Sequence, residues 1–395
     1  MIGKELILKL FQAAYIQRWN DKLRPIDFIE SDKHGHKMVI AYFLAKCQER
    51  KESIHWTGII EGGIFELLQK IILTDLKSPV FYKIKSDEKK YRELNEFVYS
   101  EIHPFLKVLG QNFCERFRTY FLTGEDTLEK RILSVSSTVA SQWEFDIIER
   151  ADPHGFETEE IKNNLLKKID QYADLECVAE LHRPASRSFI NLCGQLRFQT
   201  RWAYLHRIPK TSVQTHCLFV AILSYLFSLH IGASEKRRYN NFFAGLFHDF
   251  PEVLTRDIVT PIKRSIEGLR DFLIEYEKEQ MEKIVYPILP KDFHDEMHFF
   301  TELETFNHVR VDGEEKHVSI EEIDEKYNED IFNPCDGELV KTVDDLSAFV
   351  EAYAATKNGC MRDEFIRAQD AFRATCEMKK NLGSIDLVEI VKSFS

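Results

Sequence analysis

Apolar residues recur every three or four positions along most of the chain, which is the spacing of helices that bury one face. Strand-like alternation is rare. It is clearest in His308–Ser319, where two short alternating runs flank Asp312-Gly313, a dipeptide typical of hairpin turns. The pattern predicts a mostly α fold with a small β-hairpin near residues 306–320. Segments with the helical spacing include Leu6–Tyr15, Met38–Cys47, Tyr91–Val108, Ile161–Leu181, Leu218–Leu229, Leu269–Val285 and Leu346–Ala355.

The length of the chain predicts more than one domain. Its 395 residues exceed what one small core normally organises, and length alone favours two or three domains. The breaks at Asp152-Pro153-His154-Gly155 and at Arg183-Pro184 separate a first half from a second half. We expect a helical domain over residues 1–150, a linker helix within 151–185 and a second helical domain over 186–395.

Net charge, cysteine content and the length of the apolar runs indicate which partners and which cellular compartment to expect. Lys+Arg 53 and Asp+Glu 65 give a net charge of −12, which disfavours a surface that binds nucleic acid through its phosphates. The eight cysteines are scattered without a C-x-x-C pair, as in a reduced, cytoplasmic protein. The most apolar run, Cys217–Ala233, has about 17 residues and contains Ser224, Ser228 and His230, so it is shorter than the ~20 residues of a membrane span. We therefore expect a cytoplasmic protein without membrane contact.

Side chains that can bind a metal gather in the second half. His216 opens the apolar run, His248-Asp249 end a second apolar run, and Asp344 lies among apolar residues. Two imidazoles and two carboxylates form a set of nitrogen and oxygen donors that suits Mn, Co, Fe, Ni or Zn and leaves positions open for water and substrate. Each residue also has an ordinary structural interpretation, in which His216 caps its helix and the two aspartates face water.

An acidic residue, Glu252, follows His248 by one helical turn. Pro251 lies between them and has no N–H to donate, so a helix should end or kink just past the His-Asp pair. Such a bend would direct the carboxylate of Glu252 towards the same site.

These blocks of sequence resemble the HD-domain metal phosphohydrolases, whose ligand pattern is His, His-Asp and Asp. More narrowly, they are similar to the bacterial 5′-deoxynucleotidase branch over roughly residues 195–380. The blocks that carry the resemblance are Arg201-Trp202, Ser212–His216, His248–Lys263 and Val340–Asp344.

The resemblance implies a role for each matching residue. One divalent metal ion (Mn, Co, Fe, Ni, Zn or Mg) would be held by His216, His248, Asp249 and Asp344. Glu252 would handle the proton of the water or of the leaving group.

The same resemblance implies a set of substrate contacts. Arg201, Trp202 and Asp257 would contact phosphate and sugar, and Lys263 would add positive charge. Trp202 has a structural interpretation as well, as a core residue.

The sequence departs from the pattern of this branch in two places. The residue before the first histidine is often acidic there, whereas Thr215 stands here, so a partner that orients His216 would be missing. The separation between Asp257 and Asp344 is also longer than in the branch, and the predicted hairpin accounts for the excess. An insertion of this kind could change which substrate is accepted.

The first half contains weaker copies of the same blocks, which predicts an internal repeat. The copies of Arg201-Trp202, His216, His248-Asp249 and Asp344 are, in order, Arg18-Trp19, His36, Gly62-Gly63 and Ser136 or a neighbour. One imidazole is too few to hold a metal, so the first half is predicted to be a degenerate, non-catalytic HD-like domain. The fold would then be two tandem HD-domain helical bundles, with the hairpin inserted in the second.

The expected function is removal of phosphate from nucleotides by a divalent-metal-dependent phosphohydrolase, with 5′-deoxynucleoside monophosphates as the expected substrates. The partner would be a small nucleotide, with no stable nucleic-acid binding, and the chain would form a homodimer or an intrachain pseudo-dimer. Three alternatives remain open: an HD phosphohydrolase of a cyclic nucleotide or nucleoside triphosphate, a nucleotide-binding regulatory protein, and an HD-type oxygenase that would recruit His294 and His298 as further ligands.

Overall fold

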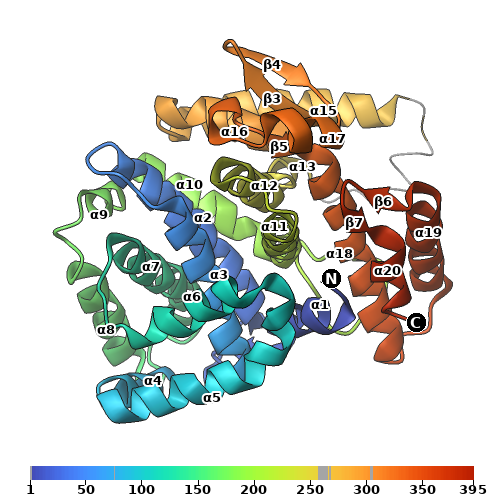
Figure 1. The fold of residues 1–395 in the computed structure, drawn as a ribbon. Coiled ribbons are helices and arrows are strands. Elements are labelled where there is room, and N and C mark those ends of the chain that lie inside the picture. The colour runs from blue at the N-terminus through green and yellow to red at the C-terminus, as the bar shows by residue number, and fades with distance from the viewer. Residues whose placement is uncertain (1, 75, 257–265, 267, 303–305) are drawn as a thin grey trace. The chain divides into compact units, whose positions relative to one another are not determined.

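The computed structural model describes residues 2–74, 76–256, 266, 268–302 and 306–395. These residues form two compact units: unit 1 comprises Met1–Leu175 with Glu389–Ser395, and unit 2 comprises Glu176–Val388. Helices dominate both units and the strands are short (Figure 1). The predicted mostly α fold class is thus confirmed.

Unit 1 is a helical bundle in which α2 and α7 pack along each other. Most residues of α2 are buried, including the charged residues Glu30, Asp32, Lys33 and Lys37. A two-residue strand pair, β1 with β2, precedes α2 and aligns Gln17 with Ile29. Its elements are α1 (Lys4–Phe11), β1 (Gln17–Arg18), β2 (Phe28–Ile29), α2 (Glu30–Glu49), α3 (Trp56–Leu73), α4 (Ser78–Lys85), α5 (Glu88–Leu106), α6 (Gln111–Leu122), α7 (Leu128–Ala151) and α8 (Thr158–Asp170).

Unit 2 is built around α11, whose residues Val213–Ser228 are all buried. By length and composition α11 is the one described helix that could cross a membrane, but 89% of it is buried inside the protein, as in a core helix. The elements of this unit are α9 (Glu176–Glu180), α10 (Pro184–Gly194), α11 (Val213–His230), α12 (Glu235–Phe247), α13 (Glu252–Thr255), α15 (Leu269–Gln280), α16 (His294–Glu302), β3 (Asn307–Val311), β4 (Glu314–His317), α17 (Ile320–Glu322), β5 (Cys335–Asp336), α18 (Gly337–Lys357), α19 (Asp363–Lys379), β6 (Asn381–Leu382) and β7 (Ile385–Asp386). The last helix, α20 (Leu387–Lys392), begins at the end of unit 2, and its residues from Glu389 on belong to unit 1.

The packing of α11 against α12 depends on one glycine. A Cβ on Gly245 would lie 2.9 Å from the Cα and the backbone N of Ala221, closer than such atoms approach each other. Because Gly245 has no side chain, the backbones of α11 and α12 can approach each other this closely. The contact lies near His216 on α11 and His248 at the end of α12.

The predicted hairpin is confirmed. Strands β3 and β4 pair antiparallel across Asp312-Gly313, whose φ angles of 56° and 84° are both in the left-handed region, as a tight two-residue hairpin turn requires. The sequence did not predict β5, which adds to the other edge of β3 and leads directly into α18.

The stretch 151–185 contains two helices in place of the single linker helix that the sequence predicts. Helix α8 ends at Asp170, and α9 begins at Glu176. The chain turns between them, and both carboxylate oxygens of Asp174 accept hydrogen bonds from Arg131 of α7 at 2.6 Å. This fixed turn interrupts the apolar spacing that had indicated one helix over Ile161–Leu181.

A buried ion pair connects α12 to the start of α18. The guanidinium of Arg237 is fully buried and donates to both carboxylate oxygens of Asp336, at 2.7 and 2.8 Å. A third bond goes to Asp324 at 2.7 Å. The pair therefore joins α12, which is followed by His248 and Asp249, to α18, which carries Asp344.

Arg237→Met is expected to lower the free energy of unfolding by about 3–5 kcal/mol, because it leaves the buried carboxylate of Asp336 without its counter-charge. Urea unfolding measures the change. Arg238→Met, on the same helix but in a surface pair with Glu235, is the control and should cost less than about 1 kcal/mol. Equal losses in the two variants would contradict the importance of the buried pair.

Candidate metal centre

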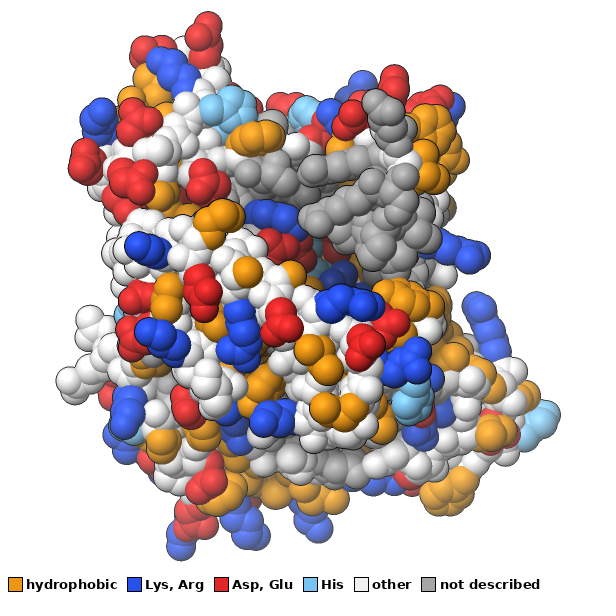
Figure 2. All heavy atoms as spheres, turned by 90° about the vertical axis from the view of Figure 1, so that its right-hand side faces the viewer, with side chains coloured by type: hydrophobic (Ala, Val, Ile, Leu, Met, Phe, Trp, Pro, Cys, Tyr) orange, Lys and Arg blue, Asp and Glu red, His pale blue; other side chains and the backbone are white. Residues whose placement is uncertain are grey.

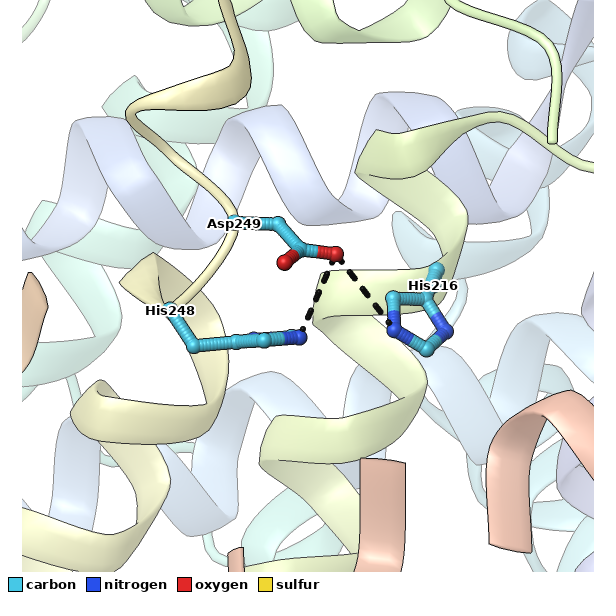
Figure 3. Close-up of side chains that lie close together, drawn as sticks. All are labelled: His216, His248 and Asp249. Carbon is cyan, nitrogen blue, oxygen red and sulfur yellow. Dashed lines mark ion pairs between the residues drawn. The ribbon is translucent and has the colours of Figure 1, made fainter. Parts of the chain in front are cut away.

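The four residues that the sequence predicts as metal ligands lie together in unit 2. His216 comes from the first turn of α11, His248 and Asp249 follow the last turn of α12, and Asp344 comes from α18. Figure 3 shows the rings of His216 and His248 and the carboxylate of Asp249 directed at one point.

The donor atoms of this cluster are separated by short distances. His216 Nε2 lies 2.9 Å from Asp344 Oδ1 and 3.6 Å from Asp249 Oδ2. His248 Nε2 lies 3.3 Å from Asp249 Oδ2 and 4.0 Å from Asp344 Oδ1. Two nitrogens and two oxygens from separate elements therefore converge, and this is the donor set that a divalent metal ion requires.

In both histidines Nδ1, the ring nitrogen that does not face the cluster, has a hydrogen-bond partner. His248 Nδ1 lies 2.9 Å from the carbonyl oxygen of Gly245. Because a carbonyl oxygen only accepts, Nδ1 carries the hydrogen, and in the neutral ring Nε2 then presents its lone pair to the cluster. His216 Nδ1 lies 2.9 Å from Ser347 Oγ, so Ser347 supplies the orienting partner that Thr215 cannot.

Both aspartates are held in the ionised form. Burial by itself raises the pKa of Asp249, but the neighbouring His248 and His216 outweigh it and hold that pKa below its ordinary value. Burial likewise opposes ionisation of Asp344, yet the contact with His216 and the charge of Lys341 lower its pKa well below the ordinary value. Lys341 Nζ sits 2.6 Å from Asp344 Oδ2, which leaves Oδ1 on the side of the histidines. The residues thus fit a divalent ion in charge as well as in donor type.

Glu252 begins the short helix α13 and is buried. Helix α12 ends at Phe247, just before the His-Asp pair and not just past it as the sequence predicts. Pro251 cannot donate the helical hydrogen bond to the carbonyl oxygen of Phe247, which lies four residues earlier, so the helix already ends there. Burial raises the pKa of the Cys217 thiol well above its ordinary value, and the charges of Asp249 and Glu252 add to this effect.

Arg201 and Trp202 are both bound to one buried carboxylate, Glu351 of α18. Arg201 Nε lies 3.1 Å from Glu351 Oε2, and Trp202 Nε1 donates to the same oxygen at 2.8 Å. Arg201 NH1 reaches to 3.8 Å from Asp249 Oδ2. The guanidinium therefore extends from Glu351 to the edge of the metal-ligand cluster.

Sequence reasoning missed Ser347 and Glu351. Together with Asp344 they occupy positions i, i+3 and i+7 of α18, which lie on one face of a helix. Polar residues at this spacing in an otherwise apolar helix were the signal that could have found them.

The remaining candidates do not join the cluster. Asp257 and Lys263 lie outside the described residues. His298 Nδ1 lies 2.7 Å from Glu302, and His294 Nε2 lies 3.3 Å from the carbonyl oxygen of Leu289. Within the part of the chain that the structure describes, the group of donors that could hold a metal is made by His216, His248 and Asp249, with Asp344 beside it.

Glu351→Gln is expected to lower the free energy of unfolding at pH 7 by roughly 3 kcal/mol. Burial opposes ionisation of Glu351, but the charges of Arg201 and Arg207 lower its pKa from 4.5 to about 2. Its contribution is therefore complete above about pH 4.5 and is lost as the pH falls towards 2.

Urea unfolding of both proteins across this pH range measures the effect. The difference in stability between wild type and Glu351→Gln should shrink below pH ~4.5. Glu377→Gln, at an exposed position of α19, is the control. A difference that stays constant down to pH ~2 would contradict the assignment.

Comparison with known proteins finds a family model that is similar to this part of the chain. The family model of the HD domain matches residues 193–374, the stretch that carries all four ligand candidates together with Arg201, Glu252 and Glu351. No curated protein and no solved structure matches the chain. HD domains generally bind divalent metal ions and act as metal-dependent hydrolases, and residues 193–374 of this chain are similar to that family.

Proposed function

We propose that this protein is a metal-dependent phosphohydrolase that removes the phosphate of nucleotides, with 5′-deoxynucleoside monophosphates as substrates. The observation that carries the proposal is the convergence of His216, His248, Asp249 and Asp344 within an HD domain. The choice of deoxynucleotides depends on the blocks around Arg201-Trp202 and His248–Lys263, which are similar to those of the 5′-deoxynucleotidase branch.

The four ligand residues would hold one divalent ion, whose chemistry is to lower the pKa of water from about 15.7 toward ~7 and to withdraw charge from a phosphoryl oxygen. Arg201 is placed to bind the phosphate. Its Nε is held by Glu351 while NH1 lies at the edge of the cluster, and a planar guanidinium suits the oxygens of a phosphate group.

Trp202 would act indirectly, because it holds Glu351, the carboxylate that also binds Arg201. Its indole N–H is bound to Glu351, and its ring packs on Phe365 with the ring centroids 5.3 Å apart. A tryptophan bound in this way fixes the position of Glu351, so we assign it a positioning role next to the substrate.

Glu252 is the proposed acid or base. It is buried and begins α13, three residues after the ligand candidate Asp249, and a carboxylate there could take a proton from attacking water or give one to the leaving 5′-oxygen. This step needs an ionisable oxygen at that position, which an amide does not offer.

The proposed partner is a small nucleotide in the cytoplasm, without stable binding to nucleic acid or membrane. On the face drawn in Figure 2, the described Lys and Arg side chains are interspersed with Asp and Glu and make no broad basic area. A phosphate would therefore be recognised by a few local groups such as Arg201.

We also propose that unit 1 is a degenerate copy of the HD domain, so that the chain is a pseudo-dimer. Arg18 and Trp19 both bind Glu144 of α7, with nitrogen to oxygen distances of 3.0 and 2.8 Å, as Arg201 and Trp202 bind Glu351. Trp19 and Trp202 have nearly the same unusual φ, 55° and 57°. In addition, the β1–β2 pairing of Gln17 with Ile29 matches the bridge between Thr200 and Ser212.

Glu252→Gln is expected to retain the metal and to lower turnover at least ~100-fold, because the amide cannot transfer a proton. The assay is phosphate release from deoxynucleoside monophosphates, with Mn, Co, Ni, Zn and Mg added separately. Glu321→Gln, at an exposed position, serves as the control.

Two outcomes of this assay would count against the proposal. Turnover like that of wild type in Glu252→Gln would remove Glu252 from the reaction. The absence of phosphate release from any nucleotide with any of the metals would favour a nucleotide-binding regulatory protein instead.

Asp344→Asn is expected to weaken binding of the divalent ion at least about tenfold. Wild-type protein should be stabilised by about 2.7 kcal/mol at a metal concentration 100 times the Kd, and a tenfold loss of affinity should remove about half of this gain. Titration calorimetry and thermal unfolding with and without chelator measure both effects. Asp345→Asn, at the next position and outside the cluster, is the control, and an equal loss in the control would contradict the ligand assignment.

A further inference from the structure

A buried lysine in unit 1 has no carboxylate to neutralise it. Lys33 of α2 is 7% exposed, and its ammonium donates to the hydroxyl oxygen of Ser137 on α7 at 2.5 Å. Among the described residues, no carboxylate lies within ion-pair distance of this ammonium. A buried cation bound only to a hydroxyl is costly unless an anion joins it.

The neighbouring carboxylates are bound by other cations. Glu30 binds Arg18 at 2.8 Å, and Glu144 binds Arg18 at 3.0 Å. Glu66 binds Lys37 at 2.5 Å. Burial is the largest influence on Lys33 and lowers its pKa to about 7; Glu30 and Glu144 counteract it, while Arg18 and Lys37 reinforce it.

The groups around Lys33 are donors suited to an oxyanion. Arg18 NH2 donates to Ser141 Oγ at 3.3 Å. Ser141 and Ser137 are four residues apart on α7, and both are partly exposed, as is Arg18. The buried ammonium of Lys33 thus contacts a hydroxyl on the partly exposed segment of α7 that also carries the partner of Arg18.

Lys33 corresponds in position to the first ligand of the metal centre. It is the fourth residue after the helix N-cap Ile29, just as His216 is the fourth residue after the N-cap Ser212. Ser137 lies seven residues before Glu144, and Asp344 lies seven residues before Glu351, so Ser137 corresponds to Asp344. The contact between Lys33 and Ser137 therefore stands in unit 1 where His216 meets Asp344 in unit 2.

We propose that Lys33, Arg18, Ser137 and Ser141 form an anion site that binds a phosphate group without hydrolysing it. The ammonium supplies the positive charge that a metal ion would supply in unit 2, and Arg18 takes the place of Arg201. Hydrolysis is not expected, because the positions of His216 and Asp344 are occupied by Lys33 and Ser137. Only the use of a nucleotide as a second ligand rests on the proposed function, and the site itself does not.

The test uses the full-length chain, stripped of metal and carrying Arg201→Ala to weaken phosphate binding in unit 2. Inorganic phosphate and deoxyadenosine monophosphate are titrated separately by calorimetry. We expect binding of the anion to this protein, and a loss of affinity of at least tenfold when Lys33→Met is added. Lys46→Met lies on the same helix, where its ammonium is bound to Glu49, and should leave the affinity unchanged.

Three results would overturn the site. The first is no binding of either ligand to the Arg201→Ala chain, which would make the cluster an internal ion network only. The second is an unchanged affinity in Lys33→Met, and the third is an equal loss in Lys46→Met. Circular dichroism checks folding, and if Lys33→Met does not fold, Arg18→Lys keeps the charge but not the planar fork and should weaken binding severalfold. An unchanged affinity in Arg18→Lys would likewise count against the site.

Failure of the proposed function gives a different result. In that case metal-loaded wild-type protein releases no phosphate, while binding that depends on Lys33 persists in the Arg201→Ala chain.

Discussion

The contact between α11 and α12 at Gly245 is the constraint on which the metal centre depends. Because a Cβ at this position would collide with the backbone of Ala221, only glycine lets the helices approach so closely. The same residue offers its carbonyl oxygen to His248 Nδ1. One position thus sets the distance between the two histidine-bearing segments and the tautomer of one histidine, and the ring centroids of His216 and His248 end 5.2 Å apart.

Helix α18 contributes the carboxylates of Asp344 and Glu351 to the site that α11 and α12 form. Its inner face presents Asp344 to the histidines, Ser347 to His216 and Glu351 to Arg201 and Trp202. A single rigid helix therefore aligns a metal ligand, the partner that orients another ligand, and the anchor of the proposed phosphate-binding arginine. Their mutual spacing is fixed by helical geometry and not by loops.

The sequence predicted those features that depend on local chemistry. Apolar spacing indicated the helices, Asp312-Gly313 indicated the hairpin turn, and Pro251 indicated the end of α12. The four candidate ligands were found because His and Asp in that order resemble a known pattern. In contrast, Ser347 and Glu351 have partners on other elements, so only their helical spacing from Asp344, and no motif, pointed to them.

The repeat shows how residue identity can mislead. His36 looks like the counterpart of His216, yet the position counted from the helix N-cap is that of Lys33, three residues earlier. The position of a residue relative to a helix N-cap and a strand pair is a property of the backbone. A comparison of residue types along the sequence does not contain this information. The proposed role of Lys33 became visible only with its burial and with its contact to Ser137.

The hairpin insertion leaves and rejoins the domain at nearly the same place. Asn307 pairs with Asp336, and its side-chain oxygen accepts from the backbone N–H of Glu338 at the start of α18. The exposed tip between β3 and β4 can lengthen, shorten or be exchanged while these ends stay paired, whereas Asp324 has to stay in place because it accepts from the buried Arg237. Chemistry and selectivity can therefore diverge separately in such a domain, since the tip of the hairpin can evolve without moving Asp344.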